Sequence, residues 1–326
     1  MKLLSTLSAL VLLAACSPPT AKWSVVLEKR PGALISLWGE SPTDVWAVGG
    51  DSGAGPEVLH LEGATWTRLA TGARGDLWWV FGFEKGPVFF GGSQGLLLRR
   101  EGSAFEVLPP PSPTTATVFG VWGPSATDLW AVGGDGNSKA FAWRFDGTQW
   151  RDVPLPGALA TTHSLFKVWG RSADDVWFVG SKGLCLHWTG AAFETVTTPT
   201  NRTLFTIHGT STRLVAVGGF GTGVVLEHDG AAWSDVSPPD GKQMTGVRMT
   251  DAGGWAAGTN GAVLSRTATG WVQEEPGPAV FDDLHAAWVD PAGGVWVAGG
   301  QVSALPLVNG VLAYKGTSPP PSTVAP

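Results

Sequence analysis

The sequence predicts an all-β fold, a seven-bladed β-propeller with four strands in each blade. Three observations predict it. A motif close to WGxSxxDVWAVG recurs along the chain, and its clearest copies span residues 37–50, 121–134 and 168–180. The copies follow one another about every 40 residues, which is the length of a propeller blade. Short apolar runs separated by Gly and Pro fill each interval, and such runs are typical of strands.

The copies can be counted on the residue three positions before the glycine of the AVG element. Seven positions fit: Trp46, Val88, Trp130, Trp177, Val215, Trp255 and Trp296. Each copy predicts a first strand that ends in an aromatic–Gly pair and a second strand that carries this anchor. A third apolar strand and a short fourth strand with an aromatic residue complete the blade. After the first fifteen residues no segment sustains a helical period.

The aromatic residue of the fourth strand occurs one time fewer than the anchor. It is found at Trp66, Phe105, Trp150, Phe193, Trp233 and Trp271. The last copy lacks its fourth strand, while residues 22–31 supply Trp23 and an apolar run before the first copy. We therefore predict that an N-terminal strand completes the seventh blade and closes the ring without a covalent link. The alternative is that Trp23 belongs to an irregular lead-in.

The first fifteen residues are typical of a secretory signal, with one lysine, an apolar run and small residues at the end. The sequence Leu13-Ala14-Ala15-Cys16 resembles the lipobox of bacterial lipoproteins. That resemblance implies that Cys16 carries diacylglycerol after signal removal and that residues 16–22 form a short lipidated linker. Ser17 after the cysteine implies, by resemblance to Gram-negative sorting, an outer-membrane location in the cell envelope. An ordinary signal peptide followed by an incidental cysteine is the alternative.

The propeller domain is expected to span residues 23–316, and the Pro-rich tail 317–326 is predicted to be disordered. A chain of this length buries enough surface to fold without a disulfide or a metal. Cys185 lies in an apolar strand and is interpreted as a small buried hydrophobic residue. No metal-ligand spacing occurs, so neither a metal nor a cofactor is predicted. The net charge of −6 and the lack of a basic run argue against nucleic acid as a partner.

The recurring motif and the turns RFDGTQW and EHDGAAW, at residues 144–150 and 227–233, carry a family resemblance. They resemble the repeats of secreted bacterial propeller lipoproteins and are similar to BNR/Asp-box and photosystem-assembly-factor propellers. The resemblance implies the fold and leaves the activity open, because propellers host unrelated functions. Asp146 and Asp229 stand directly before their glycines, unlike the aspartate of an Asp-box, and are interpreted as stabilising their turns. The single tyrosine, Tyr314, falls in the last strand, which argues against a sialidase.

Two sets of residues are candidates for binding. The loops between second and third strands open on one face of a propeller, and loops on a rigid scaffold often carry function. The polar residues of this predicted binding face are Asp51, Asp135, Asn137, Lys139 and Gln301. A second set occupies a slot of the first strand that varies from blade to blade: Ser36, Trp79, Gly120, Lys167, Thr206, Gly246 and Ala286. If this slot faces the central channel, Trp79 and Lys167 line it.

Other polar and aromatic positions have two interpretations each. Asp44, Asp128 and Asp175 precede second strands in Ser-x-x-Asp turns, where we expect them to accept backbone N–H bonds rather than bind cations or sugars. In the slot two positions after Ser36, most blades carry a tryptophan. His208 and Arg248 replace it in two blades, through either drift or a functional rim.

These features predict an envelope-anchored scaffold that binds another protein or assists an assembly, with no catalytic residues. A module that binds envelope polysaccharide is the second hypothesis, which solvent exposure of Trp79, Trp143 and Trp188 would support. A hydrolase or lyase is the third, and it requires convergent carboxylates or a metal at the channel mouth. The sequence leaves open the partner, the face used, the oligomeric state, and whether the protein faces the periplasm or the cell surface.

Overall fold

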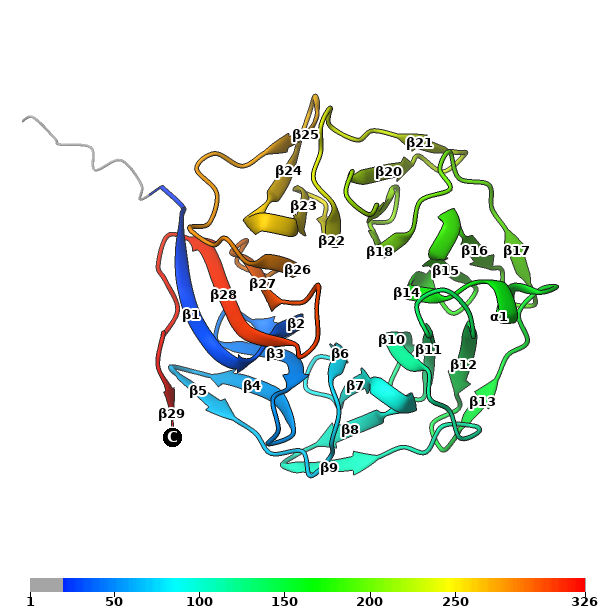
Figure 1. The fold of residues 1–326 in the computed structure, drawn as a ribbon, viewed down its shortest axis with the longest axis horizontal. Coiled ribbons are helices and arrows are strands. Elements are labelled where there is room, and N and C mark those ends of the chain that lie inside the picture. Colours follow the sequence, from blue (N-terminus) through cyan, green and yellow to red (C-terminus); the bar gives the residue numbers. More distant parts are fainter. Residues whose placement is uncertain (1–19, 326) are drawn as a thin grey trace, which may run out of the picture.

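A computed structural model describes residues 20–325 as a closed ring of seven sheets around a central axis (Figure 1). This confirms the predicted seven-bladed propeller. The predicted signal peptide and Cys16 lie outside the described residues. Over residues 20–325 the one α-helix is the single turn α1 (Leu159–Thr162). No helix in that range combines the length and apolarity that a membrane crossing needs.

The strands follow the order that the repeats predict. Blades 1 and 2 contain β2 (Leu34–Ser41), β3 (Asp44–Asp51), β4 (Pro56–Glu62), β5 (Thr65–Arg68), β6 (Leu77–Gly82), β7 (Val88–Gly92), β8 (Leu97–Glu101) and β9 (Ala104–Val107). Blades 3 and 4 contain β10 (Thr117–Ser125), β11 (Asp128–Gly134), β12 (Phe141–Phe145), β13 (Trp150–Asp152), β14 (Leu165–Ser172), β15 (Asp175–Gly180), β16 (Cys185–Trp188) and β17 (Phe193–Thr195).

The remaining blades continue the pattern. Blades 5 and 6 contain β18 (Leu204–Gly209), β19 (Leu214–Gly218), β20 (Val224–His228), β21 (Trp233–Asp235), β22 (Met244–Thr250), β23 (Gly253–Gly258), β24 (Val263–Thr267) and β25 (Gly270–Gln273). Blade 7 is built from β26 (Asp283–Val289), β27 (Val295–Gln301), β28 (Val308–Gly316) and the N-terminal β1 (Lys22–Gly32). Short 3-10 turns join the second and third strands of blades 2, 4 and 6, namely Ser93–Gly95, Ser181–Gly183 and Thr259–Gly261.

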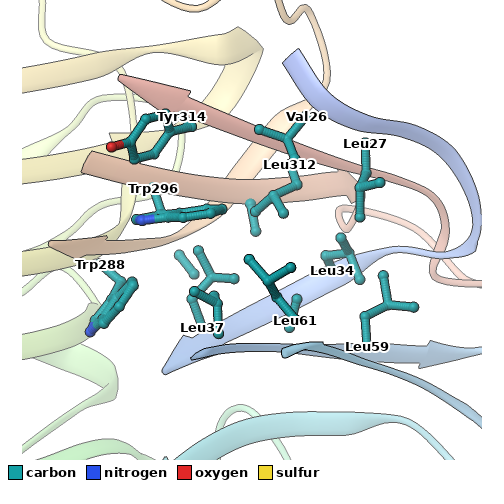
Figure 2. Close-up of a cluster of buried hydrophobic side chains, with 14 of the residues drawn as sticks. Val26, Leu27, Leu34, Leu37, Leu59, Leu61, Trp288, Trp296, Leu312 and Tyr314 are labelled. Atoms are coloured by element: carbon teal, nitrogen blue, oxygen red, sulfur yellow. The ribbon is translucent and has the colours of Figure 1, made fainter. Parts of the chain in front are cut away.

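The N-terminal strand closes the ring as predicted. β1 pairs antiparallel with β28, with Lys22 opposite Gly316 and Gly32 opposite Val308. Val26 and Leu27 of β1 are each 4% exposed. They belong to the hydrophobic core that joins blade 7 to blade 1 (Figure 2). The closure is therefore held by side-chain burial as well as by the strand ladder.

An ion pair adds to this closure. Arg30 of β1 bonds the carboxylate of Glu57 in β4 through its Nε and Nη2, at 3.0 and 2.8 Å. The Glu57 side chain is 1% exposed, and Arg68 of β5 donates to its other oxygen at 3.0 Å. Since two arginines share one buried carboxylate, the charge of Glu57 is well compensated. The pair links the N-terminal strand to the neighbouring blade.

The C-terminal tail differs from the prediction of disorder. Val324–Ala325 form a short strand, β29, which lies parallel to the outer strand β5 beside Trp66 and Thr67. The Trp66 indole N–H donates to the carbonyl of Pro321 at 2.9 Å, and Val324 packs against the same core as β1. The outer edge of β5 has free backbone groups that a neighbouring segment can satisfy. A composition rich in Pro and Ser gave no sign of that pairing.

The carboxylates of the Ser-x-x-Asp turns have a structural role, but with other partners than expected. They bind side chains of the third strand instead of backbone N–H groups of their own turns, so that detail of the prediction is wrong. The pairs are Asp44–His60 at 3.0 Å, Asp128–Arg144 at 2.8 Å and Asp175–His187 at 2.8 Å. Each pair therefore ties the start of the second strand to the third strand.

Two smaller predictions are confirmed. Asp146 and Asp229 each accept two backbone N–H bonds within their own turns, as expected for residues that stabilise the hairpin. Cys185 is 1% exposed, and burial raises the pKa of its thiol to about 12. A thiol with so high a pKa is inert as a nucleophile at neutral pH.

Candidate functional site

Every inner strand of the ring contains a β-bulge at the same point. One extra residue of the inner strand stands between two consecutive pairs with the second strand, as Phe166 does between the Leu165–Gly180 and Lys167–Val179 pairs. Such a bulge re-aims a side chain. We call the seven bulge residues the upper ring: Ile35, Trp78, Phe119, Phe166, Phe205, Thr245 and His285.

The upper ring surrounds a hollow of about 580 Å³ at one mouth of the channel. All of the upper ring except Ile35 lines this upper hollow. Loops between second and third strands contribute Asn137, Phe220 and Ser303 to its wall. We call this side of the propeller, which carries those loops and the loops between blades, the upper face.

Aromatic rings run around the upper hollow as a continuous arc. The centroids of successive rings are 5.0–5.7 Å apart, in the order His285, Trp78, Phe119, Phe166, Phe205 and Phe220. Most of these pairs meet edge to face, which is a favourable geometry for aromatic rings. The arc forms an apolar wall of the upper hollow. Within this wall, the edge of one ring covers the face of the next.

The variable first-strand slot, which includes Trp79 and Lys167, is the position directly after the bulge residue in each inner strand. The polar members of the slot make hydrogen bonds between blades. The Trp79 indole donates to the carbonyl of Val121 at 2.7 Å, and Lys167 Nζ donates to the carbonyl of Phe119 at 2.9 Å. Lys167 lines the upper hollow, while Trp79 lines a second hollow deeper in the channel. The two meet, with Nζ 3.6 Å from the centre of the Trp79 ring.

Burial changes the titration of the groups at the base of the upper hollow. It lowers the pKa of Lys167 well below the usual value. Burial, together with the nearby Lys167, lowers the pKa of His285 to about 4, so this imidazole is neutral at neutral pH. Its Nδ1 lies 2.8 Å from the carbonyl of Ile35 and therefore carries the proton. Within residues 20–325, the hydrogen-bond partners of both groups are backbone carbonyls, and neither is paired with a carboxylate.

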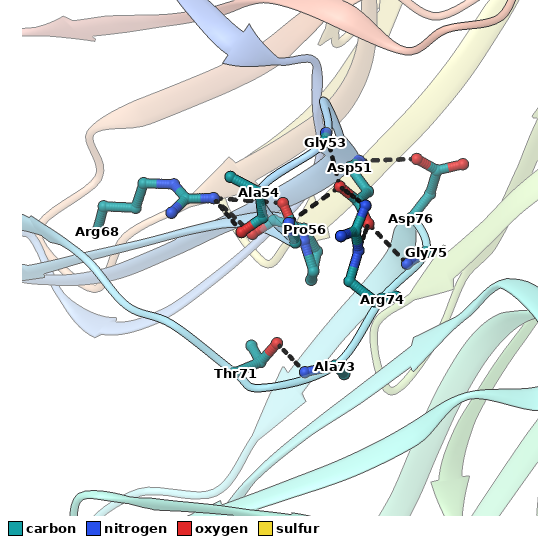
Figure 3. A network of polar contacts seen from close by, with 11 residues as sticks. Asp51, Gly53, Ala54, Pro56, Arg68, Thr71, Ala73, Arg74, Gly75 and Asp76 are labelled. Atoms are coloured by element: carbon teal, nitrogen blue, oxygen red, sulfur yellow. Dashed lines mark hydrogen bonds and ion pairs between the residues drawn. The ribbon is translucent and has the colours of Figure 1, made fainter.

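Of the five residues of the predicted binding face, Asn137 lines the upper hollow. Asp51 is instead the centre of a loop network (Figure 3). It accepts N–H bonds from Gly53 and Gly75, at 2.8 and 2.9 Å, and from Arg74 Nε at 2.8 Å. Burial of Asp51 opposes ionisation, but these hydrogen bonds outweigh it and lower the pKa to about 2. Asp51 therefore organises its loop.

Asp135, Lys139 and Gln301 also hold their own loops. Asp135 accepts the backbone N–H of Ser138 at 2.7 Å, and Lys139 lies 3.9 Å from the same carboxylate. Gln301 donates its side-chain amide to the carbonyl of Pro306 at 3.0 Å. Asn137 and Lys167 thus both line the upper hollow, Trp79 lines the deeper one, and the other predicted residues line neither.

Sequence reasoning missed the aromatic arc and the exposed apolar side chains near it. A signal for the arc exists, because four inner strands place an aromatic residue directly after a buried Leu or Val, at Trp78, Phe119, Phe166 and Phe205. The three most exposed large apolar side chains of residues 20–325 are Phe220, Phe281 and Leu305, at 70%, 89% and 78%. All three lie on loops of the upper face.

The off-pattern tryptophans do not form an exposed surface. Trp143 and Trp188 are buried, at 3% and 9% exposure, and Trp79 is half-buried in its contact with Lys167. The sugar-stacking hypothesis requires exposed tryptophan rings, and these three side chains do not provide them. Among residues 20–325, no cluster of three or more His, Cys, Asp or Glu side chains is placed to hold a metal ion.

Comparisons with known proteins support the fold and do not extend to activity. No protein-family model matches the chain, and neither does a curated protein sequence. Among solved structures, streptogramin B lyase is 12% identical with a TM-score of 0.71, covering 90% of this chain and 97% of that one. The WD40 propeller domain of Doa1 is 10% identical with a TM-score of 0.69, covering 91% and 98%. YCF48 bound to D1 peptide is 15% identical with a TM-score of 0.66, covering 93% and 99%.

Proposed function

We propose that this protein is a lipid-anchored propeller of the bacterial cell envelope that binds another protein on its upper face. One observation carries the proposal: Phe220, Phe281 and Leu305, the most exposed large apolar side chains in the described chain, all project from upper-face loops. Solvent-exposed apolar side chains gathered on one face are typical of protein-interaction sites. The outer edges of the blades expose smaller side chains, such as Val107 and Val272.

The upper hollow gives a partner a place to insert side chains. It combines an apolar arc with polar groups at its rim, including Asn137, Gln243 and Ser303. Pockets of this kind, apolar with a few polar groups, accept the anchoring side chains of a partner. The hollow of about 580 Å³ lies within the usual range for ligand sites. We therefore place the centre of the interface over the channel mouth.

The chain direction supports the use of the upper face by an anchored protein. Lys22, at the start of β1, pairs with Gly316 at the end of β28, on the side opposite the second-to-third-strand loops. Few residues separate Cys16 from Lys22, and a fully extended chain spans about 3.5 Å per residue. A lipid on Cys16 would hold the lower side of blade 7 near the membrane. The upper face would then point away from the membrane, toward a partner.

The structural neighbours give this proposal support at the level of the fold. One of them, YCF48, has been solved with a peptide of D1, so a propeller of this shape can hold a protein segment. Another neighbour is a lyase, streptogramin B lyase. The hydrolase or lyase hypothesis requires convergent carboxylates or a metal at the channel mouth, and of the described residues that line the upper hollow only Asp283 is acidic. Its carboxylate is occupied by the N–H of Asn260 and the hydroxyl of Ser303.

Binding to polysaccharide is less well supported than binding to protein. A sugar stacks on an open aromatic face, and the rings of the arc cover one another edge to face. The buried Trp143 and Trp188 offer no such face either. We retain polysaccharide as the alternative ligand, which a glycan pull-down with the same variants would detect.

Replacing the three exposed upper-face residues is expected to abolish partner binding without changing stability. The variant Phe220→Ser, Phe281→Ser, Leu305→Ser removes exposed side chains, and exposed substitutions change stability by only about 0.5 kcal/mol each. The matched control is Val25→Ser, Val107→Ser, Val272→Ser, which changes the exposed apolar residues of the outer strands. Both variants and the wild type would be extracted from the native host with their lipid, and co-purifying proteins quantified by mass spectrometry.

The proposal requires a stoichiometric partner that is retained by the wild type and the outer-strand control and is lost from the upper-face variant. Loss from the control alone would place the interface on the outer strands and refute the proposed face. A wild type that co-purifies with no partner and is instead retained by envelope polysaccharide would establish the alternative function.

A further inference from the structure

A second ring of equivalent residues closes the deeper end of the channel. In six blades this residue lies in the inner strand opposite the predicted anchor, as Trp38 lies opposite Trp46. In blade 2 the predicted anchor Val88 is one residue off, because Phe81 lies opposite Phe89. We call this set the lower ring: Trp38, Phe81, Trp122, Trp169, His208, Arg248 and Trp288. All seven line one hollow of about 320 Å³, the lower hollow. Six members are aromatic, and Arg248 is the exception.

Arg248 has no partner among the described residues. It takes part in no ion pair, and its Nε is enclosed without any hydrogen bond. Burial lowers the pKa of its guanidinium to about 10, and the group still carries its charge at neutral pH. An enclosed cation without a counter-ion is unfavourable, and an arriving anion would relieve that cost. The other arginines near blade 6 differ, because Arg213 and Arg266 share the carboxylate of Glu227.

Within the lower hollow the polar side chains beside Arg248 are His208 and Thr206, and the Thr206 hydroxyl donates to the carbonyl of Thr245. His208 Nδ1 accepts the backbone N–H of Met249 at 3.2 Å, so the ring proton of the neutral imidazole resides on Nε2. Burial, with Arg248 close by, lowers the pKa of His208 well below its usual value, and the ring is therefore neutral. Among residues 20–325, no Asp or Glu lines the lower hollow.

We propose that the lower hollow binds a small aromatic monocarboxylate, with its carboxylate on the guanidinium of Arg248. A planar guanidinium matches a carboxylate in two parallel hydrogen bonds. The tryptophan and phenylalanine side chains of the lower ring supply an apolar wall for the body of the ligand. Arg248 also lines a neighbouring hollow of about 520 Å³ between blades 6 and 7, together with Arg266 and Asp290. The Asp290 carboxylate there is engaged by the Trp296 indole and by the backbone N–H groups of Ala292 and Gly294. This site does not depend on protein binding at the upper face.

The test is isothermal titration of the full chain in non-ionic detergent with phenylacetate, with its neutral analogue phenylacetamide, and with inorganic phosphate. Phenylacetate is expected to bind saturably and at least tenfold more tightly than either of the others. Arg248→Met should remove at least tenfold of the phenylacetate affinity and leave the melting temperature unchanged or higher, since the unpaired cation is gone. The matched control is Arg151→Met, on an exposed outer strand, which should bind phenylacetate like the wild type.

Equal affinity for phenylacetate and phenylacetamide overturns the proposal, and so does full phenylacetate binding by Arg248→Met. Tighter binding of phosphate than of phenylacetate would overturn the ligand class and leave a simple oxyanion site. An absence of saturable binding by every probe also overturns it. If Arg248→Met does not fold, the comparison of the three probes on the wild type still tests whether the site prefers an aromatic carboxylate.

Discussion

Removing β1 is expected to destroy the folded ring. A chain that begins at Ala33 loses the outer strand of blade 7, the buried side chains of Val26 and Leu27 and the Arg30–Glu57 pair. Loss of the two apolar side chains alone costs roughly 3–6 kcal/mol. A domain is stable by only about 5–15 kcal/mol in total, and the uncovered edge of β28 would pair with other copies. Thermal melts by circular dichroism and size-exclusion chromatography would show aggregation and no cooperative transition.

Two shorter chains provide the controls for this deletion. A chain beginning at Thr20 keeps β1 and is expected to melt like the full protein. A chain ending at Gly316 loses β29 and the hydrogen bond from Trp66 to Pro321, which is worth about 1 kcal/mol. If the chain beginning at Ala33 stays monomeric and melts with the Thr20 control, then β1 does not close the ring.

Trp296→Ala is expected to be the most destabilising of the anchor substitutions. Trp296 is fully buried, packs against Trp66, Trp288 and Tyr314, and donates its indole N–H to the buried Asp290 at 3.0 Å. Truncating a buried tryptophan costs about 3–5 kcal/mol, and the orphaned acceptor adds about 1–3 kcal/mol. Urea unfolding followed by circular dichroism would measure the loss.

The equivalent substitution in blade 6 is the control. Trp255 occupies the same repeat position but is partly exposed, so Trp255→Ala is expected to cost roughly half as much as Trp296→Ala. Losses of equal size at the two positions would show that repeat position, and not burial between blades 7 and 1, sets the energy.

The architecture could be predicted because the spacing of the repeats along the chain determines the number and order of the blades. The anchors from Trp46 to Trp296 count the blades, and the missing seventh fourth-strand aromatic assigns Trp23 to blade 7. The tail could not be predicted in this way. Val324 and Ala325 pair with β5 because the outer edge of β5 is free in the folded ring. The tail sequence itself contains no pattern that predicts this pairing.

The channel could be predicted only in part, because the bulge interrupts the alternation of each inner strand. In a regular strand every second side chain faces the same side, so this rule applied from the buried Leu77 predicts that Trp79 lies in the channel beside it. The extra bulge residue Trp78 is instead the one that belongs to the arc. A one-residue shift of this kind reverses which side chains face the channel. The replacement of a tryptophan by Arg248 was visible in the repeats, but its missing counter-ion became apparent only when the seven blades were placed around one hollow.

The most direct test of the proposed function is site-specific photocross-linking in the native host. A photoreactive phenylalanine analogue at position 281, on the upper face, is compared with the same analogue at position 272, on the outer strand β25. Both native side chains are exposed, at 89% and 42%. The proposal predicts a discrete cross-linked partner from position 281 and none from position 272. A partner captured from position 272 and not from position 281 would contradict binding on the upper face.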